Sequence, residues 1–156
     1  RPAGVETVTP TFVDTNILAY ARDRRAQAKQ VVAEGWLSAL ARRREGRIST
    51  QVLIEYYAVA THPQKLDLPA AAAQADCRAL QAWEPVAPDS ELLDSAWSVQ
   101  ERHGFSWWDA LIVAAALRQD CSLLLTEDMQ HGLVVDNRLT LVNPFASDAP
   151  LPPAAP

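Results

Sequence analysis

The alternation of short apolar segments with longer helix-patterned segments constrains the fold of this chain more than any other sequence feature. Four strand-like segments are expected, at 7–14, 47–50, 122–126 and 139–145. Between them the apolar spacing indicates helices, at 15–23, 26–44, 51–62, 69–82, 91–103 and 106–120. Because strands that are separated by helices usually pair in parallel, the sequence predicts an α/β fold with a central parallel sheet covered by helices on both faces.

The size and composition of the chain indicate one globular domain. It has 156 residues, of which 49% are hydrophobic and 21% are charged, so it can bury a sizeable core. No apolar run reaches the roughly 18 residues of a membrane span, so no membrane association is expected. Cys77 and Cys121 form no C-x-x-C pair and are expected to be reduced thiols of a cytoplasmic protein. We expect the domain at 11–145, after an extension or cloning remnant at 1–10 that includes the start of the first strand, and before a flexible Pro/Ala-rich tail at 146–156.

The charges of the chain are unevenly distributed. The net charge is −5, whereas proteins that bind nucleic acid usually carry a basic surplus. Basic residues nevertheless form two local runs, which are Arg22, Arg24, Arg25 and Lys29, and Arg42, Arg43, Arg44 and Arg47. Such runs most often lie on solvated helix faces, and the alternative is that they guide the phosphates of a nucleic acid.

Four acidic residues stand where an α/β fold places its functional site. In open parallel sheets, ligands bind beyond the carboxyl ends of the strands. Asp14 ends the first expected strand, and Asp128 follows the third. Glu55 lies about one turn past the second strand, and Asp109 lies in the first turn of an otherwise apolar helix. The fold therefore predicts that these four carboxylates lie at the same edge of the sheet.

Each of these acids also has a purely structural explanation. Asp14 suits a turn or a helix cap, Glu55 suits a helix surface, and Asp128 suits a loop. Asp109 follows Ser106 by three residues, as in a capping box. Only the conjunction of all four acids favours a functional site.

The four acids together predict a site for a divalent cation. Carboxylates that converge without a lysine or arginine repel one another, and each raises the pKa of its neighbours. A hard cation with oxygen ligands, Mg²⁺ or Mn²⁺, would relieve that repulsion. Zinc fits less well, because His62, His103 and His131 are scattered and no His/Cys set has ligand spacing.

Four sequence blocks carry these acids, and together they resemble the PIN-domain nucleases. The blocks are FVDTNILAY, STQVLIEYYAVATHP, SWWDALIVAAAL and LLLTEDMQHG, and the resemblance extends over about 11–145. The greatest similarity is to the VapC-type toxins of bacterial toxin–antitoxin pairs. This resemblance implies a PIN-like three-layer α/β/α domain with a central parallel sheet.

The resemblance also implies roles for particular residues. The catalytic acidic quartet, which would hold Mg²⁺ or Mn²⁺ directly or through water, would be Asp14, Glu55, Asp109 and Asp128. Asn16 and Thr126 would steady these carboxylates by hydrogen bonds, whereas Glu127 falls outside the family's pattern. The implied activity is that of a metal-dependent endoribonuclease that hydrolyses tRNA or rRNA with a metal-activated water and leaves 5′-phosphate and 3′-hydroxyl ends. The implied partners are a cognate VapB-type antitoxin and a second copy of the chain in a homodimer.

Other interpretations depend on particular residues. A phosphatase with an aspartyl nucleophile usually has D-x-D after its first strand, where this chain has D-T-N. A receiver-like signalling module needs a lysine near its acids, and Lys29 and Lys65, the only lysines, stand in poor places for that role. A P-loop enzyme is excluded, because no glycine forms G-x-x-x-x-G-K. A catalytically silent PIN-like binding module is the remaining alternative.

Overall fold

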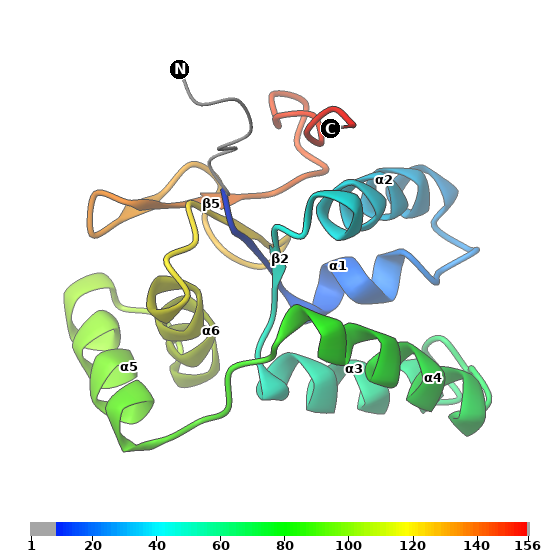
Figure 1. Cartoon of the computed structure of the whole chain (residues 1–156), viewed down its shortest axis with the longest axis horizontal. Coiled ribbons are helices and arrows are strands. Elements are labelled where there is room, and N and C mark those ends of the chain that lie inside the picture. The colour runs from blue at the N-terminus through cyan, green and yellow to red at the C-terminus, as the bar shows by residue number, and fades with distance from the viewer. Residues whose placement is uncertain (1–8, 156) are drawn as a thin grey trace, which may run out of the picture.

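Five strands form a single sheet in the computed structural model, which describes residues 9–155 (Figure 1). The strands are β1 (Thr11–Val13), β2 (Gly46–Arg47), β3 (Leu123–Leu125), β4 (Val134–Val135) and β5 (Leu139–Val142). Their order across the sheet is β2-β1-β3-β5-β4. In the parallel part of the sheet, Phe12 of β1 lies opposite Arg47 on one side and Leu124 on the other. The predicted α/β fold is confirmed.

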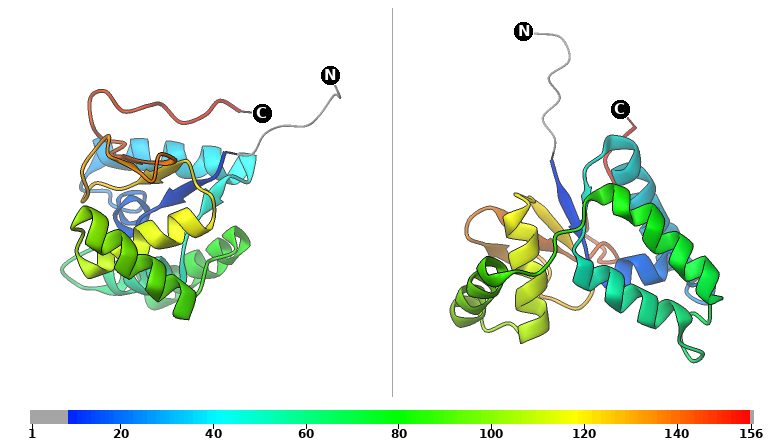
Figure 2. Two further views of the ribbon diagram at one scale, coloured as in Figure 1. Left: turned by 90° about the vertical axis from the view of Figure 1, so that its left-hand side faces the viewer. Right: turned by 60° about the horizontal axis from the view of Figure 1, so that its bottom comes forward.

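Six α-helices and one 3₁₀-helix, η1, connect these strands within the described residues. They are α1 (Thr15–Tyr20), α2 (Gln27–Arg43), α3 (Thr50–Thr61), α4 (Ala70–Leu80), η1 (Gln81–Trp83), α5 (Ser90–His103) and α6 (Trp107–Arg118). In Figures 1 and 2, α5 and α6 lie side by side on one side of β1, and α1 to α4 lie on the other. This is the expected three-layer α/β/α arrangement.

β4 is the strand that the sequence did not predict. It has two residues, Val134–Val135, and it pairs antiparallel with β5. Asp136 and Asn137 join the two strands with φ angles of 51° and 55°, as in the type I′ turns of hairpins. The prediction of a parallel sheet is therefore wrong at this edge, because two residues are too few to show the alternation of a strand.

Side-chain caps fix the start of α1, which follows Asp14, and the start of α6, which carries Asp109. Asp14 caps α1, since its Oδ1 accepts a hydrogen bond from the backbone N–H of Thr15 at 2.7 Å. Ser106 caps α6, since its hydroxyl accepts from the backbone N–H of Asp109 at 3.2 Å. Both carboxylates therefore stand at the N-terminal end of a helix, where the helix dipole favours negative charge.

Helix α6 is a core element. All of its residues from Ala110 to Leu117 are buried, as the apolar sequence predicts for a helix surrounded by protein. It packs against α5 and contacts β3, whose Leu124 is fully buried. Because a close-packed core resists displacement, α6 holds Asp109 in a fixed position relative to the sheet.

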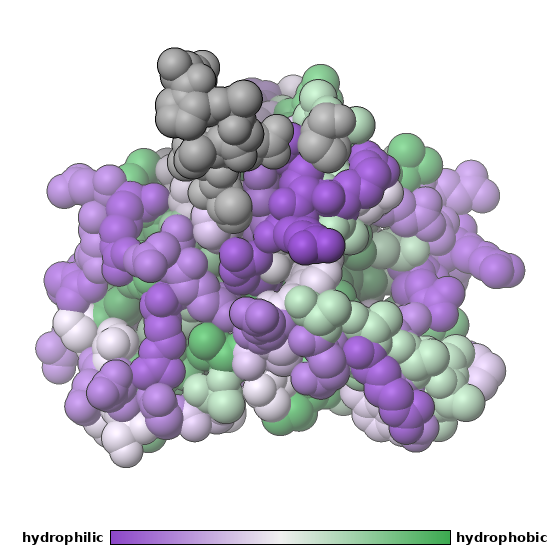
Figure 3. All heavy atoms as spheres, in the orientation of Figure 1, coloured by the Kyte–Doolittle hydropathy of each residue, from purple (hydrophilic) through white to green (hydrophobic). Residues whose placement is uncertain are grey.

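The face of the domain that Figure 3 shows is mainly hydrophilic. Small apolar side chains gather on this face over the alanine-rich α4. Between residues 9 and 155, no helix combines the length and the apolar character that crossing a membrane requires. The two cysteines are free thiols, with Cys121 buried and Cys77 partly buried.

Candidate active site

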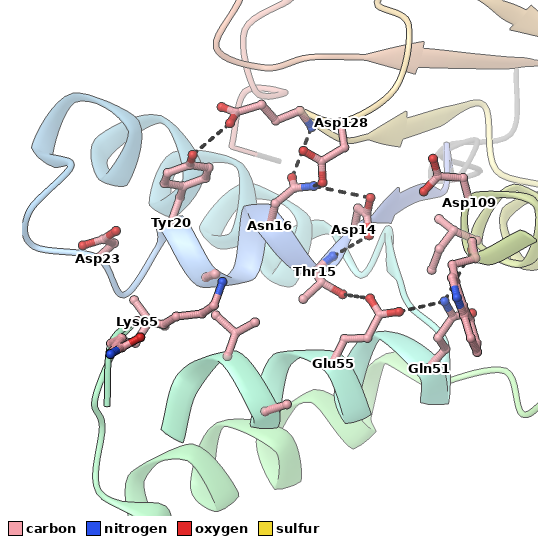
Figure 4. Close-up of a pocket in the computed structure, with 18 of the residues that line it drawn as sticks. Asp14, Thr15, Asn16, Tyr20, Asp23, Gln51, Glu55, Lys65, Asp109 and Asp128 are labelled. Atoms are coloured by element: carbon pink, nitrogen blue, oxygen red, sulfur yellow. Dashed lines mark hydrogen bonds between the residues drawn. The ribbon is translucent and has the colours of Figure 1, made fainter. Parts of the chain in front are cut away.

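A pocket of about 810 Å³ opens where β1 and β3 end (Figure 4). The four acids predicted from the sequence all line it, and they are Asp14, Glu55, Asp109 and Asp128. They come from the end of β1, from α3, from the first turn of α6 and from the loop after β3. The structure thus brings together four side chains that are far apart in the sequence.

Asp14 is the most deeply placed of these acids. Its residue is 6% exposed, and its Oδ2 accepts a 2.8 Å hydrogen bond from the hydroxyl of Thr126. Its other oxygen accepts from the backbone of Thr15, as the cap of α1. The capping explanation of Asp14 is therefore correct in its geometry, and it leaves the Oδ2 edge facing the end of β3.

Thr15 connects Asp14 with Glu55. The Thr15 backbone N–H donates to Asp14, and its hydroxyl donates to Glu55 Oε2 at 2.8 Å. Gln51, one turn before Glu55 on α3, donates to Glu55 Oε1 at 2.8 Å. Gln51 and Glu55 are four residues apart on one helix and so share a face, whereas no local pattern indicates that Thr15 reaches α3, because that contact spans 40 residues.

Asn16 and Thr126 connect Asp14 with Asp128. The amide of Asn16 donates to Asp128 Oδ2 at 2.9 Å and lies 3.4 Å from Asp14 Oδ2. Thr126 donates to Asp14 and accepts from the backbone N–H of Asp128 at 3.2 Å. Both residues therefore stand beside the carboxylates that the sequence assigned to them.

The Asp109 carboxylate differs from the other three acids in accepting no hydrogen bond of 3.5 Å or shorter from a described residue, although the nearby Ser106 hydroxyl opposes the rise that burial causes in its pKa. The backbone N–H of Asp109 donates to Ser106. The reciprocal bond of a capping box, from the Asp109 side chain back to the backbone of Ser106, is not formed within the described part of the chain. The cap of α6 therefore does not use the Asp109 carboxylate.

Burial dominates the electrostatics of the pocket. It raises the pKa of Asp14 to about 6, while hydrogen bonds oppose the rise and repulsion from Glu55 and Asp128 contributes less. Burial also raises the pKa of Asp109, and repulsion from Asp128 and Glu55 is again a smaller cause. A raised pKa is thus found at two of the acids, but the predicted cause, crowding of carboxylates, is the lesser one.

A cluster that the sequence did not predict supports the loop after β3. Glu127 accepts from the Tyr20 hydroxyl at 2.8 Å and forms a 2.5 Å ion pair with Lys29. The Lys29 ammonium also lies 4.7 Å from the centre of the Tyr20 ring and 5.3 Å from that of Phe145. These contacts join α1, α2 and the chain after β5 to the residue next to Asp128.

The family of this chain follows from its sequence together with this arrangement. The sequence model of the PIN domain matches residues 11–134. The chain belongs to the PIN domain family. The resemblance carried by the four sequence blocks is thereby confirmed at the level of the family, whereas no curated protein matches the chain.

Three solved structures share the fold of this PIN domain. A toxin–antitoxin complex from Klebsiella pneumoniae has a TM-score of 0.58 at 19% identity, with 86% of this chain and 98% of that chain covered. VapC20 of Mycobacterium tuberculosis, described as a sarcin–ricin loop cleaving toxin, has a TM-score of 0.57 at 21% identity, with 76% and 89% covered. VapBC2 from Rickettsia felis, bound to a DNA fragment from its promoter, has a TM-score of 0.56 at 20% identity, with 85% and 97% covered.

Some cationic side chains of the domain line the pocket and others do not. Lys65 and Arg25 line the same pocket as the acids, but among the described residues neither forms an ion pair with any of the four. Figure 4 shows Lys65 at the opposite end of the pocket from Asp109. In the second arginine run, Arg43 pairs with Glu45 at 3.1 Å and does not line the pocket.

The histidines take no part in the pocket, as the sequence suggested. His131 lies 3.0 Å from Asp148 and accepts from the backbone N–H of Asn143 at 2.9 Å. His62 follows α3 as its C-cap, and His103 is the last residue of α5. None of the three lines the pocket.

The acids of this PIN domain suit a hard divalent cation in their chemistry. Within the described residues none of the four forms an ion pair, so the buried Asp14 carboxylate has no cationic partner. In residues 9–155, however, no three Asp, Glu, His or Cys side chains lie close enough together to hold one ion. The arrangement therefore fits an ion such as Mg²⁺, which one or two carboxylates bind while it keeps several waters.

Proposed function

We propose that this PIN domain is a metal-dependent endoribonuclease and the toxin of a toxin–antitoxin pair. The observation that carries the proposal is the gathering of four carboxylates, without a paired cation, at the carboxyl edge of the sheet. Structural acids are usually paired or exposed, because an unpaired buried carboxylate is costly. Asp14 is buried and unpaired, so its position suits a functional ligand better than a purely structural residue.

The acids that would hold Mg²⁺ or Mn²⁺, one or two of them directly and the others through water, are Asp14, Glu55, Asp109 and Asp128. A bound ion would neutralise phosphate charge and lower the pKa of a water, as divalent cations do in phosphodiester hydrolysis. The residues of the chain itself would orient the carboxylates that bind the ion. Asn16 and Thr126 orient Asp14 and Asp128, so that their free oxygen edges face the pocket.

Glu55 and Asp109 complete the site from the helical side of the pocket. Thr15 and Gln51 each donate to one oxygen of Glu55, which restricts the rotation of its carboxylate. The Asp109 carboxylate, which has no bond to hold it within the described residues, keeps its rotational freedom on a rigid helix. Its side chain is thus able to turn toward a ligand without any movement of the backbone.

The toxin role and the partners rest on the likeness to solved toxin–antitoxin proteins together with the sequence blocks. We propose tRNA or rRNA as the substrate, a VapB-type antitoxin as the inhibitor, and a homodimer as the assembly. An unpaired acidic pocket suits an antitoxin that inserts an arginine or lysine, since a charge-assisted hydrogen bond would replace the missing cation. Hydrolysis is expected to leave 5′-phosphate and 3′-hydroxyl ends.

A cleavage assay tests the activity. The purified protein is incubated with total tRNA and with rRNA, in Mg²⁺ or Mn²⁺ and then in EDTA, and the 5′ ends of the products are sequenced. We expect discrete cleavage that EDTA abolishes. Asp14→Asn and Asp109→Asn should each abolish it, whereas Asp94→Asn, an exposed acid of α5 outside the pocket, should cleave like the wild type.

Three results would contradict the proposal or a part of it. Cleavage that persists in EDTA would exclude the metal-dependent mechanism. Absence of cleavage in every metal would favour a catalytically silent PIN-like binding module. A co-purified antitoxin that leaves cleavage unchanged would argue against the inhibitory contact with the acids.

A further inference from the structure

Trp108 is an exposed indole at the edge of the acidic pocket. It is 64% exposed, yet it lines the pocket together with Asp14 and Asp109. As the second residue of α6, it directly precedes Asp109. A large apolar ring that stays in water does not contribute the free energy of burial, so the exposure of Trp108 requires an explanation.

Packing explains the other tryptophans but not this one. Trp36 is buried, and Trp83 lies under Gly46, where a Cβ would come within 2.6 Å of its ring. Trp107 stacks on Trp97, with ring centres 5.9 Å apart and planes inclined by 21°. Trp108 has no aromatic partner among the described residues.

The backbone beneath the exposed ring is held firmly. Ser106 caps the first turn of α6, and the carbonyl of Trp108 lies 3.4 Å from the amide of Gln51. The same amide donates to Glu55, so Gln51 connects the backbone of Trp108 to this carboxylate. A ring with an accessible surface on a fixed backbone is the arrangement that stacking on a planar ligand requires.

The charges around the pocket indicate what kind of planar ligand fits. Arg25 pairs with Asp23 at 3.1 Å, whereas Lys65 forms no ion pair within the described residues. Figure 4 shows Lys65 at one end of the pocket and Gln51, which adjoins Trp108, near the other. A ligand with a phosphate near Lys65 and a base near Trp108 would pass over the acids between them.

We infer that Trp108 is a base-stacking residue that receives an unpaired nucleobase of the RNA next to the phosphate held at the acids. The inference rests on the proposed nuclease function for the class of its ligand. Bases inside a helix are stacked on each other and are not available to a side chain, so the RNA must be unpaired at this position. Stacking tolerates any base, because every base offers a flat face.

A nucleic acid explains the exposed indole better than an apolar protein surface does. The apolar depression of the domain lies elsewhere, on α3 and α4, and includes Leu53, Ile54 and Tyr57 but not Trp108. The pocket that Trp108 lines combines apolar side chains such as Ile112 with amides and acids such as Gln51 and Asp109. An exposed aromatic ring beside polar groups that can bind a phosphate backbone is typical of base recognition.

The test compares binding of two probes that carry equal charge. One is a fluorescein-labelled single strand of twelve adenosine ribonucleotides, and the other is an abasic ribose–phosphate chain of the same length. Both are titrated with Asp14→Asn protein in Mg²⁺, so that neither is cleaved, and the dissociation constants are measured by fluorescence anisotropy. We expect the base-bearing strand to bind about tenfold more tightly.

Substitutions assign that preference to one ring. In the same background, Trp108→Ala should reduce the preference to about onefold by weakening only the base-bearing strand, and Trp108→Phe should retain part of it. Trp97→Phe, at the other exposed tryptophan of the described residues, which is 50% exposed and lies outside the pocket, should leave the preference unchanged. Thermal melts of each variant establish that it is folded.

Two outcomes would overturn the inference. A Trp108→Ala protein that keeps the tenfold preference would assign the indole to a protein partner instead. A protein with intact Trp108 that shows no preference for bases would show that the ring does not stack. Because the readout is a ratio of affinities, it is independent of cleavage, so its failure is distinguishable from failure of the proposed nuclease activity.

Discussion

The hydroxyl of Thr126 donates a 2.8 Å hydrogen bond to Asp14 Oδ2 across 112 residues of sequence. The bond joins the ends of the neighbouring parallel strands β1 and β3. It also supplies the buried Asp14 carboxylate with a donor in place of a cation, and it lowers the pKa of that carboxylate. The hydrogen bond that orients Asp14 in the proposed site therefore also connects two strands of the sheet.

Removal of this hydroxyl should destabilise the domain at neutral pH. Thr126→Val keeps the shape of the side chain but leaves a buried carboxylate oxygen without its donor, at a cost of about 1–3 kcal/mol. The loss should be smaller at pH 4, where Asp14 is protonated, because the pKa of Asp14 rises further in the variant. Urea unfolding at pH 4 and pH 7 measures both values. Thr126→Ser retains the hydroxyl and serves as the control, and equal losses for the two variants would contradict the explanation.

Asp14 should make the metal-free domain less stable as the pH rises. Its pKa is about 6 in the folded state and 3.8 in the unfolded state, so the folded state holds the proton more tightly. The resulting stabilisation is complete below pH 3.8 and is lost as the pH rises through 6. The expected loss is on the order of 2 kcal/mol. Thermal melts in EDTA from pH 4 to 8 should show it for the wild type relative to Asp14→Asn, and a constant difference between the two would exclude the raised pKa.

A divalent cation should offset this loss. An ion that binds the folded domain but not the unfolded chain raises the melting temperature. Once the concentration of Mg²⁺ or Mn²⁺ exceeds the dissociation constant, the stabilisation grows with the logarithm of that concentration. We expect the wild type at pH 7.5 to gain stability in millimolar Mn²⁺, and Asp14→Asn to gain markedly less. Asp94→Asn should respond like the wild type. An equal shift in all three proteins would indicate ion binding outside the pocket.

Asp109→Asn should raise the melting temperature in EDTA. The carboxylate has a raised pKa and no bond to a described residue, so its charge opposes folding at neutral pH. Because the side chain is partly exposed, the gain should be only about 0.5 kcal/mol. Ser106→Ala, which removes the cap of α6, should instead cost about 1 kcal/mol. A clear loss of stability in Asp109→Asn would show that its carboxylate serves the helix.

Lys29 should affect cleavage without entering the pocket. Lys29→Met removes the ion pair with Glu127 and so loosens the loop that carries Asp128. We expect cleavage to fall by about tenfold, the usual effect of losing a residue that supports a metal ligand. The stability change should stay below about 1 kcal/mol, because the pair is partly exposed. Lys29→Arg retains the charge and should keep most of the wild-type activity. If Lys29→Arg loses as much activity as Lys29→Met, the packing of the Lys29 side chain matters more than its charge.

Local sequence patterns predicted the helices and the edge of the sheet where the acids gather. Asp14 and Asp128 follow strands, and Asp109 follows a capping serine, so each can be placed from its immediate neighbours. Contacts that depend on how elements cross could not be predicted in this way. Lys29 reaches Glu127 across 98 residues, and no local pattern indicates such a pair.

The two incorrect predictions, the fully parallel sheet and the cause of the raised pKa values, also concern properties that depend on how elements pack together. β4 has two residues, and its pairing becomes evident only from the turn at Asp136 and Asn137. The cause of the raised pKa values was misjudged because the sequence shows that acids are numerous but not how deeply Asp14 is buried. Burial depth is a property of the assembled layers rather than of any segment.

The pairing of β1 with β3 has a consequence for the newly made chain. Asp14 is synthesised early, but the strand that flanks it and the hydroxyl that orients it arrive only with Leu123–Leu125 and Thr126. Asp128 comes two residues later still. A polypeptide interrupted before β3 therefore carries three of the four acids but lacks both the strand that flanks Asp14 and the hydroxyl that orients it, so the proposed activity can arise only after most of the chain has been synthesised.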